Sequence, residues 1–235
     1  MNNADIRGAF ADLSTPQIAD ACVRLELPLR AAPAGVRALD PRWRLAGSVI
    51  PCRHYGSVDV FFEAMESARD GDVLVIDNGG RADEGCIGDL TVLEARSSGI
   101  AGLAVWGCHR DTRDLLAIGL PVFSYGIFPG GPRRLDDRGP DAVRSARFGE
   151  VLATREDVVF ADEDGALFVA AAALDKVLEA AAGIRKTERA QADAVKTGRN
   201  LREQLRFGEY LKRRETEPGY SFRQHLRRVG GAIEE

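Results

Sequence analysis

The sequence predicts an α/β protein with a mixed central sheet, followed by a helical C-terminal extension. Two short segments, 72–77 (DVLVID) and 101–106 (AGLAVW), are almost continuously apolar, which is typical of strands buried on both faces. Amphipathic helices are predicted over residues 58–68 and 88–97 and from residue 111. Strands that alternate with helices in this way favour βαβ units with parallel strands.

The ends of the main domain carry further signals. A helix to about Leu25 is predicted from its start signals. These are a hydroxyl cap, a first-turn proline and a capping amide at Ser14, Pro16 and Gln17. A short strand is expected at 47–52. Turn-forming residues separate three later strand candidates, which we expect to be antiparallel: 143–148, 157–161 and 166–169. From residue 172 the pattern is helical to about 215, and a final short helix is expected at 222–229.

Charge divides the chain into two parts. With 235 residues and 45% apolar composition, the chain is long enough for one sizeable core with an appendage. Residues 1–175 carry 18 Lys and Arg against 27 Asp and Glu, whereas residues 176–235 carry 14 against 9. We therefore predict a main domain at 1–175 and a helical extension at 176–235. Acids alternate with bases in the extension, which favours a helix that is solvated or packed on a neighbouring subunit over a nucleic-acid-binding tail.

Composition also excludes several classes of protein. No apolar run approaches the roughly 18 residues of a membrane span, and the N-terminus lacks the apolar stretch of a secretory signal, so a cytoplasmic protein without membrane contact is expected. The cysteines lack the close CxxC pairs of zinc sites, and reduced, buried thiols are expected at Cys22, Cys52, Cys86 and Cys108.

Lysine is confined to the extension. Residues 1–175 contain no lysine. The four lysines of the sequence are Lys176, Lys186, Lys196 and Lys212. An imine mechanism needs a lysine amine. If the active site lies in the main domain, Schiff-base chemistry is therefore excluded there.

Two loops that follow the buried strands form the candidate site. Ligands of open α/β sheets bind beyond the carboxyl ends of such strands, here at residues 78–89 and 107–111. Gly85 and Gly88 allow close approach of the backbone, and the start of the next helix favours an anion such as a carboxylate. The glycine pattern matches neither a dinucleotide fingerprint nor a phosphate loop, so it gives no support to a nucleotide or methyl-donor cofactor.

The pair Arg110 and Asp111 opens the helix after the second loop. A guanidinium can grip a substrate carboxylate in bidentate fashion while the neighbouring carboxylate holds a hard cation. The alternative is a surface ion pair or a helix cap, and the same alternative applies to Asp89. His109 is expected to be a neighbour and not a ligand. His54 and His225 have no partner at metal spacing, which argues against histidine-based zinc catalysis.

These residues resemble the RraA-like family. The resemblance rests on GDVLVIDNGG at 71–80, GCIGD at 85–89 and GIAGLAVWG at 99–107, and above all on Asp89 followed after twenty residues by Arg110 and Asp111. It covers roughly residues 14–182. Characterised members of the family include the 4-hydroxy-4-methyl-2-oxoglutarate/4-carboxy-4-hydroxy-2-oxoadipate aldolases.

The resemblance implies an α-β-β-α sandwich fold, a homotrimer or homohexamer, and a divalent-metal-dependent lyase. Such an enzyme cleaves a 4-hydroxy-2-oxo acid by a retro-aldol reaction, releases pyruvate, and decarboxylates oxaloacetate as a side activity. By resemblance, Asp111 binds Mg²⁺ or Mn²⁺, Arg110 binds the substrate carboxylate, and Asp89 orients or deprotonates a water. The backbone of Gly85, Gly88 and Leu90 would complete the anion pocket.

The C-terminal part departs from the family pattern. The family aldolases take an acidic residue from the C-terminal region of a neighbouring subunit, and the last 50 residues here do not match that pattern; Glu179 and Glu188 are both candidates. Two other functions stay open: a non-catalytic protein that binds and regulates ribonuclease E, as some relatives do, and a methyltransferase. The joint presence of Asp89, Arg110 and Asp111 argues against the first, and the absence of a methyl-donor loop argues against the second.

Overall fold

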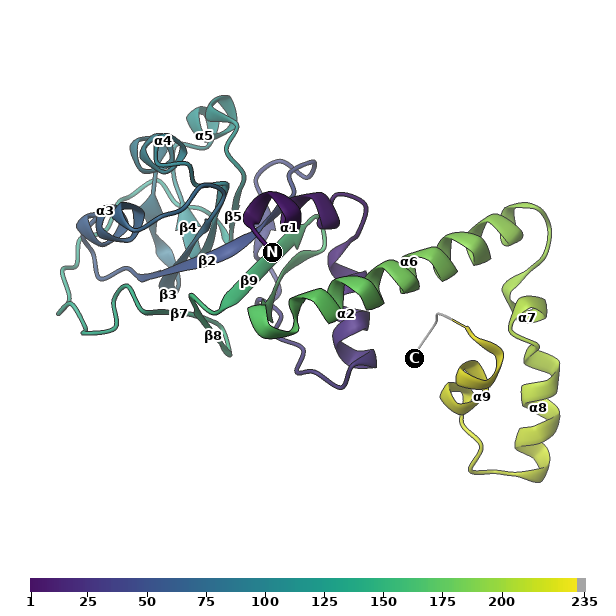
Figure 1. Ribbon diagram of the computed structural model, residues 1–235. Helices are drawn as coiled ribbons and strands as arrows, with labels where there is room; N and C mark the ends of the chain where they lie inside the picture. Colours follow the sequence, from purple (N-terminus) through teal and green to yellow (C-terminus); the bar gives the residue numbers. More distant parts are fainter. Residues whose placement is uncertain (232–235) are drawn as a thin grey trace. The chain divides into compact units, whose positions relative to one another are not determined.

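The computed structural model describes residues 1–231 (Figure 1). The helices are α1 (Asn3–Phe10), α2 (Thr15–Arg24), α3 (Asp59–Glu66), α4 (Asp89–Ser97), α5 (Thr112–Ile118), α6 (Leu174–Lys196), α7 (Leu201–Gln204), α8 (Phe207–Thr216) and α9 (Phe222–Val229). The strands are β1 (Arg37–Ala38), β2 (Leu45–Arg53), β3 (Val73–Ile87), β4 (Gly102–His109), β5 (Val122–Ser124), β6 (Gly126–Ile127), β7 (Ser145–Phe148), β8 (Val151–Thr154), β9 (Asp157–Asp162) and β10 (Gly165–Ala170).

The main sheet is mixed, which confirms the predicted fold class. Its order is β1-β5-β4-β3-β2-β9-β10, and β6 pairs with β4 beyond the end of β5. Strands β2 to β5 pair in parallel, whereas β9 lies antiparallel to both β2 and β10. A separate antiparallel hairpin is formed by β7 and β8. The predicted βαβ half and the predicted antiparallel half are therefore both present.

Two hydrophobic clusters cover the two faces of the sheet. Along β3, Leu74 and Ile76 belong to the cluster under α3, α4 and α5, while Val73 and Val75 belong to the cluster that includes β7, β8 and β10. Side chains alternate between the faces of a strand, so a strand covered on both sides must be apolar at every position. That is why the sequence of β3 shows no polar alternation. Figure 1 shows α3, α4 and α5 together on one side of the strands.

Strand β3 is longer than predicted. We expected it to stop at the turn 78–80, but pairing with β4 continues to Ile87, with register irregularities between Asp77 and Arg81 and again on either side of Gly85. The bulges let the strand pass through residues that favour turns without leaving the sheet. Most of the predicted loop 78–89 is therefore an irregular strand, and the first three residues of the predicted loop 107–111 belong to β4.

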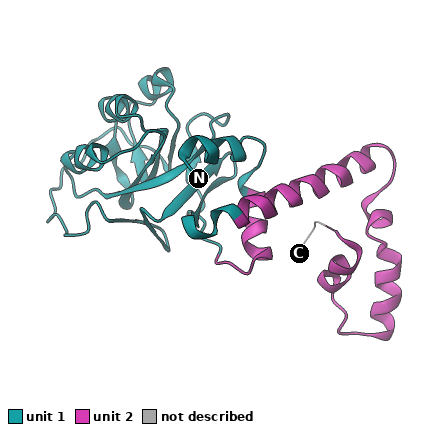
Figure 2. Cartoon of the chain, viewed as in Figure 1, with its two compact units in different colours: residues 1–15, 29–175 teal, residues 16–28, 176–235 magenta. Residues whose placement is uncertain are grey.

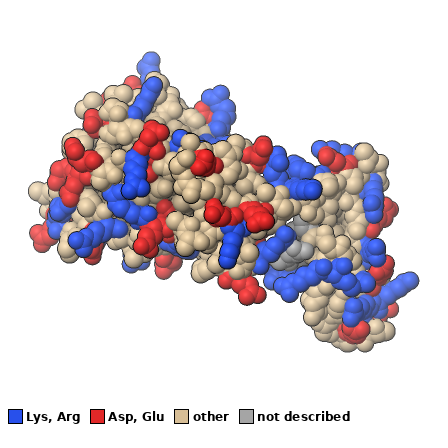
Figure 3. Space-filling model, in the orientation of Figure 1, with Lys and Arg blue, Asp and Glu red and all other residues tan. Residues whose placement is uncertain are grey.

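The chain forms two compact units (Figure 2). The first comprises residues 1–15 and 29–175 and contains the sheet; the second comprises residues 16–28 and 176–235 and contains α2 and α6 to α9. The boundary at 175 coincides with the change of charge in the sequence, and the second unit additionally includes the early segment 16–28. In Figure 3, basic side chains gather over the second unit with acidic ones between them.

The C-terminal helices are more segmented than predicted. Instead of one helical stretch from 172 to 215, a 3₁₀ turn at Ala171–Ala173 leads into α6, and breaks after Lys196 and at Leu205 separate α7 and α8. Asn200 caps α7 through its side chain, and Ser221 and Gln224 form a capping box on α9. Within residues 1–231, no helix combines the length and apolar character needed to cross a membrane. All four cysteines are buried and free, as predicted.

Candidate functional site

The predicted site lies at the carboxyl ends of the parallel strands β3 and β4. Strand β3 ends at Ile87 and leads through Gly88 into α4, while β4 ends at His109 and leads through Arg110 and Asp111 into α5. A backbone hydrogen bond joins these two strand-to-helix connections: the Arg110 N–H donates to the carbonyl of Ile87 at 3.0 Å. Asp89, Arg110 and Asp111 are thus brought to one place, as the spacing of the motif requires.

Asp111 adopts an unusual backbone conformation. Its φ and ψ angles of 58° and 35° are left-handed, which disfavours residues other than glycine and aspartate or asparagine. Within the described structure its carboxylate makes no capping bond to α5. Instead, Asp111 Oδ2 lies 3.5 Å from Arg110 Nε and accepts a long hydrogen bond of 3.4 Å from the Asp89 N–H. The strained backbone therefore holds the carboxylate over the start of the other helix.

Gly88 and Gly85 provide the space that this arrangement needs. A Cβ atom on Gly88 would overlap Asp111 Oδ2, and a Cβ atom on Gly85 would lie 3.1 Å from Arg110 Cβ and 2.6 Å from the carbonyl oxygen of Phe128. Both glycines were predicted to allow close approach of the backbone. The group that lies nearest to Gly88 is the Asp111 carboxylate, whereas Gly85 lies against both the Phe128 carbonyl and the Arg110 side chain.

Arg110 is accessible. Its side chain is 46% exposed and that of Asp111 is 36% exposed. A pair so open to water contributes little to stability, typically about 0–1 kcal/mol. Because a strained backbone and two glycines support a pair of so little structural value, its arrangement is better explained by ligand binding than by folding.

Carboxylates already occupy part of the predicted anion pocket. The Leu90 N–H donates to Asp89 Oδ1 at 2.8 Å, and the Asp89 N–H donates to Asp111 Oδ2 at 3.4 Å. These are N–H groups at the start of α4, where an anion is stabilised. The Leu90 side chain is 75% exposed. In this structure the protein's own carboxylates therefore take the N–H groups that were expected to bind a substrate carboxylate.

His109 supports the site and has no free ring nitrogen to bind a metal. It is 3% exposed, its Nδ1 lies 2.7 Å from Ser124 Oγ, and its Nε2 lies 3.0 Å from Thr112 Oγ1. Burial lowers the pKa of His109 despite the opposing influence of Asp111, so the neutral imidazole is favoured. His109 is thus a neighbour of the site, in keeping with the prediction.

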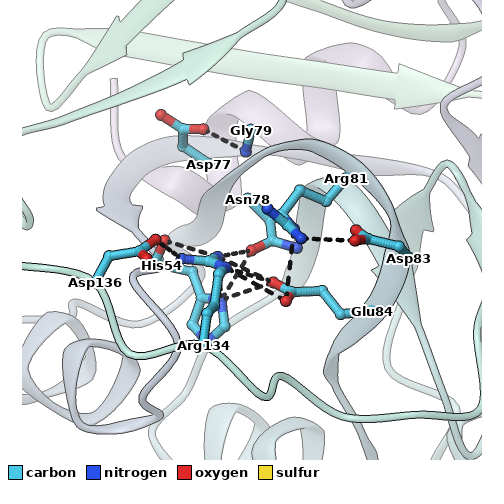
Figure 4. Close-up of polar contacts among 9 residues, drawn as sticks. All are labelled: His54, Asp77, Asn78, Gly79, Arg81, Asp83, Glu84, Arg134 and Asp136. Carbon is cyan, nitrogen blue, oxygen red and sulfur yellow. Dashed lines mark hydrogen bonds and ion pairs between the residues drawn. The ribbon is translucent and has the colours of Figure 1, made fainter.

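A second polar cluster was missed by the sequence analysis (Figure 4). Glu84 is 4% exposed and pairs with Arg134, whose Nη2 also donates to Asn78 Oδ1 at 2.8 Å. His54 Nδ1 lies 2.8 Å from the same Asn78 oxygen. Burial lowers the pKa of His54, partly offset by the bond with Asn78. His54, Asn78 and Arg134 line a cavity of about 290 Å³. No signal in the sequence marked this cluster, because Glu84 falls in the stretch 78–89 that was predicted to be a loop.

The side chains at the site fit a hard, hydrated cation. Among residues 1–231, no group of three or more His, Cys, Asp or Glu side chains could enclose a metal ion. Mg²⁺ does not need such a cage, since it usually keeps several waters and takes one or two carboxylates with oxygens of the substrate. Asp111, with an accessible carboxylate cradled at Gly88, offers that kind of partial donor set.

The candidate acids of the extension lie in the second unit. Glu179 is exposed on α6, whereas Glu188 on the same helix accepts a hydrogen bond of 2.7 Å from Gln17 Nε2. Glu188 also helps burial to raise the pKa of Asp20. The exposed Glu179 is the more accessible of the two.

Comparison with known proteins identifies the family. The family model RraA-like (Aldolase/RraA) matches residues 15–168. A protein of Aromatoleum aromaticum named "Putative 4-hydroxy-4-methyl-2-oxoglutarate aldolase" is 28% identical over 149 residues, covering 63% of this chain and 92% of its own.

Two solved structures share the fold. RraAS2 of Streptomyces coelicolor, described as an unusual member of the RNase ES inhibitor RraA family, superposes with a TM-score of 0.68 at 26% identity, covering 77% of this chain and 92% of its own. An uncharacterized protein of Pseudomonas syringae gives a TM-score of 0.72 at 21% identity, covering 83% and 94%. The resemblance seen in the sequence is thereby confirmed.

Proposed function

Because the chain belongs to the RraA-like family, we propose that it is a divalent-metal-dependent lyase that cleaves a 4-hydroxy-2-oxo acid and releases pyruvate. One observation carries the proposal: the structure joins Asp89, Arg110 and Asp111 at the two strand-to-helix crossings, with the Asp111 carboxylate held by a left-handed backbone against Gly88. Relatives named as aldolases support the reaction class.

Arg110 and Asp111 divide the binding of the substrate between them. The Arg110 guanidinium binds the carboxylate next to the 2-oxo group. The N–H groups of Asp89 and Leu90 also donate to this carboxylate once it displaces their present partners, the side chains of Asp111 and Asp89. Asp111 would hold Mg²⁺ or Mn²⁺, a cation that commonly takes one or two protein carboxylates and leaves room for water and substrate. When bound, the cation supplies a Lewis acid for the 2-oxo oxygen, worth several kcal/mol in the transition state.

The proton is moved by Asp89 through water. In the retro-aldol step the C4 hydroxyl loses its proton, the C3–C4 bond breaks, and its electron pair passes to the C2 oxygen of the pyruvate enolate. Asp89 accepts that proton through an ordered water, and the proton then returns to C3 to give the methyl group of pyruvate. Arg110 lies beside the developing negative charge and stabilises it. The other product is the carbonyl compound derived from C4.

The composition of the first unit favours this type of aldolase. Residues 1–175 contain no lysine, so that segment has no side-chain amine to form an imine with the 2-oxo group. Loss of CO₂ from oxaloacetate leaves the same enolate, and we therefore include oxaloacetate decarboxylation as a side activity. The proposal places the enzyme in the cytoplasm as a homotrimer or homohexamer, with the helical extension packed on a neighbouring subunit and contributing Glu179 or Glu188.

A second candidate function is regulation of ribonuclease E by direct binding. The likeness to RraAS2 favours it, because that protein is described as a member of an RNase inhibitor family. A binding protein of this kind would not need Asp111 to adopt a strained conformation beside Arg110.

The test is pyruvate formation from a panel of 4-hydroxy-2-oxo acids and oxaloacetate, with Mg²⁺ or Mn²⁺ present. Arg110→Ala and Asp111→Asn should each lose at least about 100-fold in kcat/KM, since each removes a charge that the transition state needs. Arg113→Ala and Asp114→Asn, exposed neighbours on α5, are matched controls and should retain activity. Full activity in either site variant would refute the mechanism, and ribonuclease inhibition without turnover would favour the second function.

A further inference from the structure

Arg134 ties together three segments at the carboxyl edge of the sheet. It comes from residues 128–139, a stretch without helix or strand, and its guanidinium reaches back to β3. There it meets Glu84 at 2.9 Å from Nη2, with Nε 3.2 Å and 3.3 Å from the two carboxylate oxygens. Nη2 also donates to Asn78 Oδ1 at 2.8 Å and, at 3.4 Å, to the carbonyl of His54. Nη1 bonds Asp136.

The pair of Arg134 and Glu84 is enclosed. The Glu84 side chain is 5% exposed and that of Arg134 is 17% exposed. Burial alone would lower the pKa of Arg134, but the bonds to Glu84 and Asp136 outweigh it and the pKa is raised. A largely buried, charge-assisted ion pair with several hydrogen bonds fixes the positions of its two side chains. The exposed pair of Arg138, further along the same segment, and Glu63 is not held in this way.

The pair adjoins the part of the backbone that supports Arg110. Gly85, directly after Glu84, donates its N–H to the carbonyl of Gly130 at 2.8 Å. Arg110 runs between these two segments: a Cβ atom on Gly85 would lie 3.1 Å from Arg110 Cβ, and one on Gly131 would lie 2.8 Å from Arg110 Nη1. Glu84 is thus the neighbour of one residue that lies against the Arg110 side chain, and Arg134 lies three residues after the other.

We propose that Arg134 and Glu84 are positioning residues, whose ion pair holds the Gly85 and Gly130 segments together and so aims the Arg110 guanidinium at the substrate carboxylate. The inference rests on the proposed function for the role of Arg110. Neither residue touches the substrate in this proposal. Arg134 and Glu84 act as one unit, so removing both should harm binding no more than removing one.

The experiment compares Glu84→Gln, Arg134→Lys and the double variant Glu84→Gln/Arg134→Gln, which leaves no charge buried at this position. Arg138→Gln is the control, because it removes an exposed ion pair from the same segment. We expect KM to rise about 10-fold in the three variants with a smaller change in kcat, since Arg110 already binds the carboxylate in the ground state. The dissociation constant of oxalate, measured by calorimetry with Mg²⁺, should rise by the same factor. The control should keep wild-type values.

Hydrogen exchange tests the pair without reference to activity. The Gly85 N–H should exchange at least about 10-fold faster in the variants, because its bond to Gly130 loses its support, while the amides of Val73 to Ile76 in the same strand should not change. Unchanged KM, unchanged oxalate affinity or unchanged exchange at Gly85 would overturn the inference. A wild-type protein that neither releases pyruvate nor binds oxalate would instead overturn the proposed function, and the exchange measurement would still judge the pair.

Discussion

At the scale of the residue, the geometry of the site depends on Asp111 and Gly88. A left-handed aspartate costs roughly 1–2 kcal/mol relative to an ordinary conformation, and no side-chain capping bond from Asp111 to α5 offsets that cost. The conformation places Asp111 Oδ2 where a side chain on residue 88 would otherwise lie. The two residues are 23 positions apart in sequence and depend on each other.

Gly88→Ala tests this dependence. The φ of Gly88 is −144°, which alanine adopts without strain, so the new methyl group should act by displacing the Asp111 carboxylate and, to a lesser extent, the Arg110 side chain, whose Nε would lie 3.2 Å from it. We expect the fold to be retained and kcat/KM for pyruvate release to fall about 100-fold, as a misplacement of about 1 Å can cause. Gly8→Ala, where a Cβ atom meets open space, is the control. Wild-type turnover in Gly88→Ala would show that the position of Asp111 does not matter.

The motif residues of the site could be predicted from the sequence, but the residues that hold them in position could not. Asp89, Arg110 and Asp111 follow strands that a local pattern reveals, and the structure brings them together at one edge. Arg134 lies in a segment without periodicity, and its partner Glu84 was assigned to a loop. Only the irregular continuation of β3 turns Glu84 inward, and no short motif encodes that bulge.

At the scale of the element, β3 shows where local signals fail. Asn78, Gly79 and Gly80 are strong turn formers, and the prediction ended the strand there. Pairing with β4 resumes at Arg81 because both glycines take positive φ angles of 65° and 67° and absorb the irregularity. Helix α1 was also missed: its capping box uses Asn2 and Asp5 in place of the usual hydroxyl and longer acid or amide. Helices α3 and α4, the start of α5 and strands β2 and β4 were otherwise predicted to within a few residues.

Gly79→Ala and Gly80→Ala separate backbone strain from steric overlap. Both glycines are left-handed, so each alanine should cost about 1 kcal/mol in the free energy of unfolding. A Cβ atom on Gly80 would also lie 2.9 Å from the Trp106 ring, whereas on Gly79 it meets only Arg81 Cγ at 4.0 Å. Urea unfolding should therefore show Gly80→Ala to be the less stable variant by at least about 1 kcal/mol. Equal losses would mean that Trp106 moves aside freely.

At the scale of the whole molecule, the two units differ in what stabilises them. The first has apolar clusters on both faces of a sheet. The second contains the aromatic side chains of Tyr210, Tyr220 and Phe222 around His225, with Phe207 against Tyr210 and Phe222 and with Arg213 stacked on Tyr220. Sequence periodicity predicted α9 accurately. The breaks between α6, α7 and α8 escaped it, because polar helical spacing continues across them.

The stability of the first unit should depend on pH. Burial lowers the pKa of both His54 and His109, so the unfolded chain, with an ordinary histidine pKa near 6.5, binds more protons than the folded chain in mild acid. The free energy of unfolding should fall as the pH drops below about 6.5, by up to about 1.4 kcal/mol per pH unit for each histidine, and level off above pH 7. Urea titrations of His54→Gln and His109→Gln should show a shallower loss than wild type. Identical pH profiles would show that these imidazoles are not held neutral.

The central claim is that a divalent cation at Asp111 and the guanidinium of Arg110 together hold the 2-oxo acid. The direct test is a calorimetric titration with oxalate. Oxalate resembles the enolate of pyruvate because each presents oxygen atoms on two adjacent carbons. We expect binding that appears with Mg²⁺ or Mn²⁺, disappears with EDTA, and is lost in both Asp111→Asn and Arg110→Ala. Oxalate binding of equal strength without the cation, or in either variant, would contradict it.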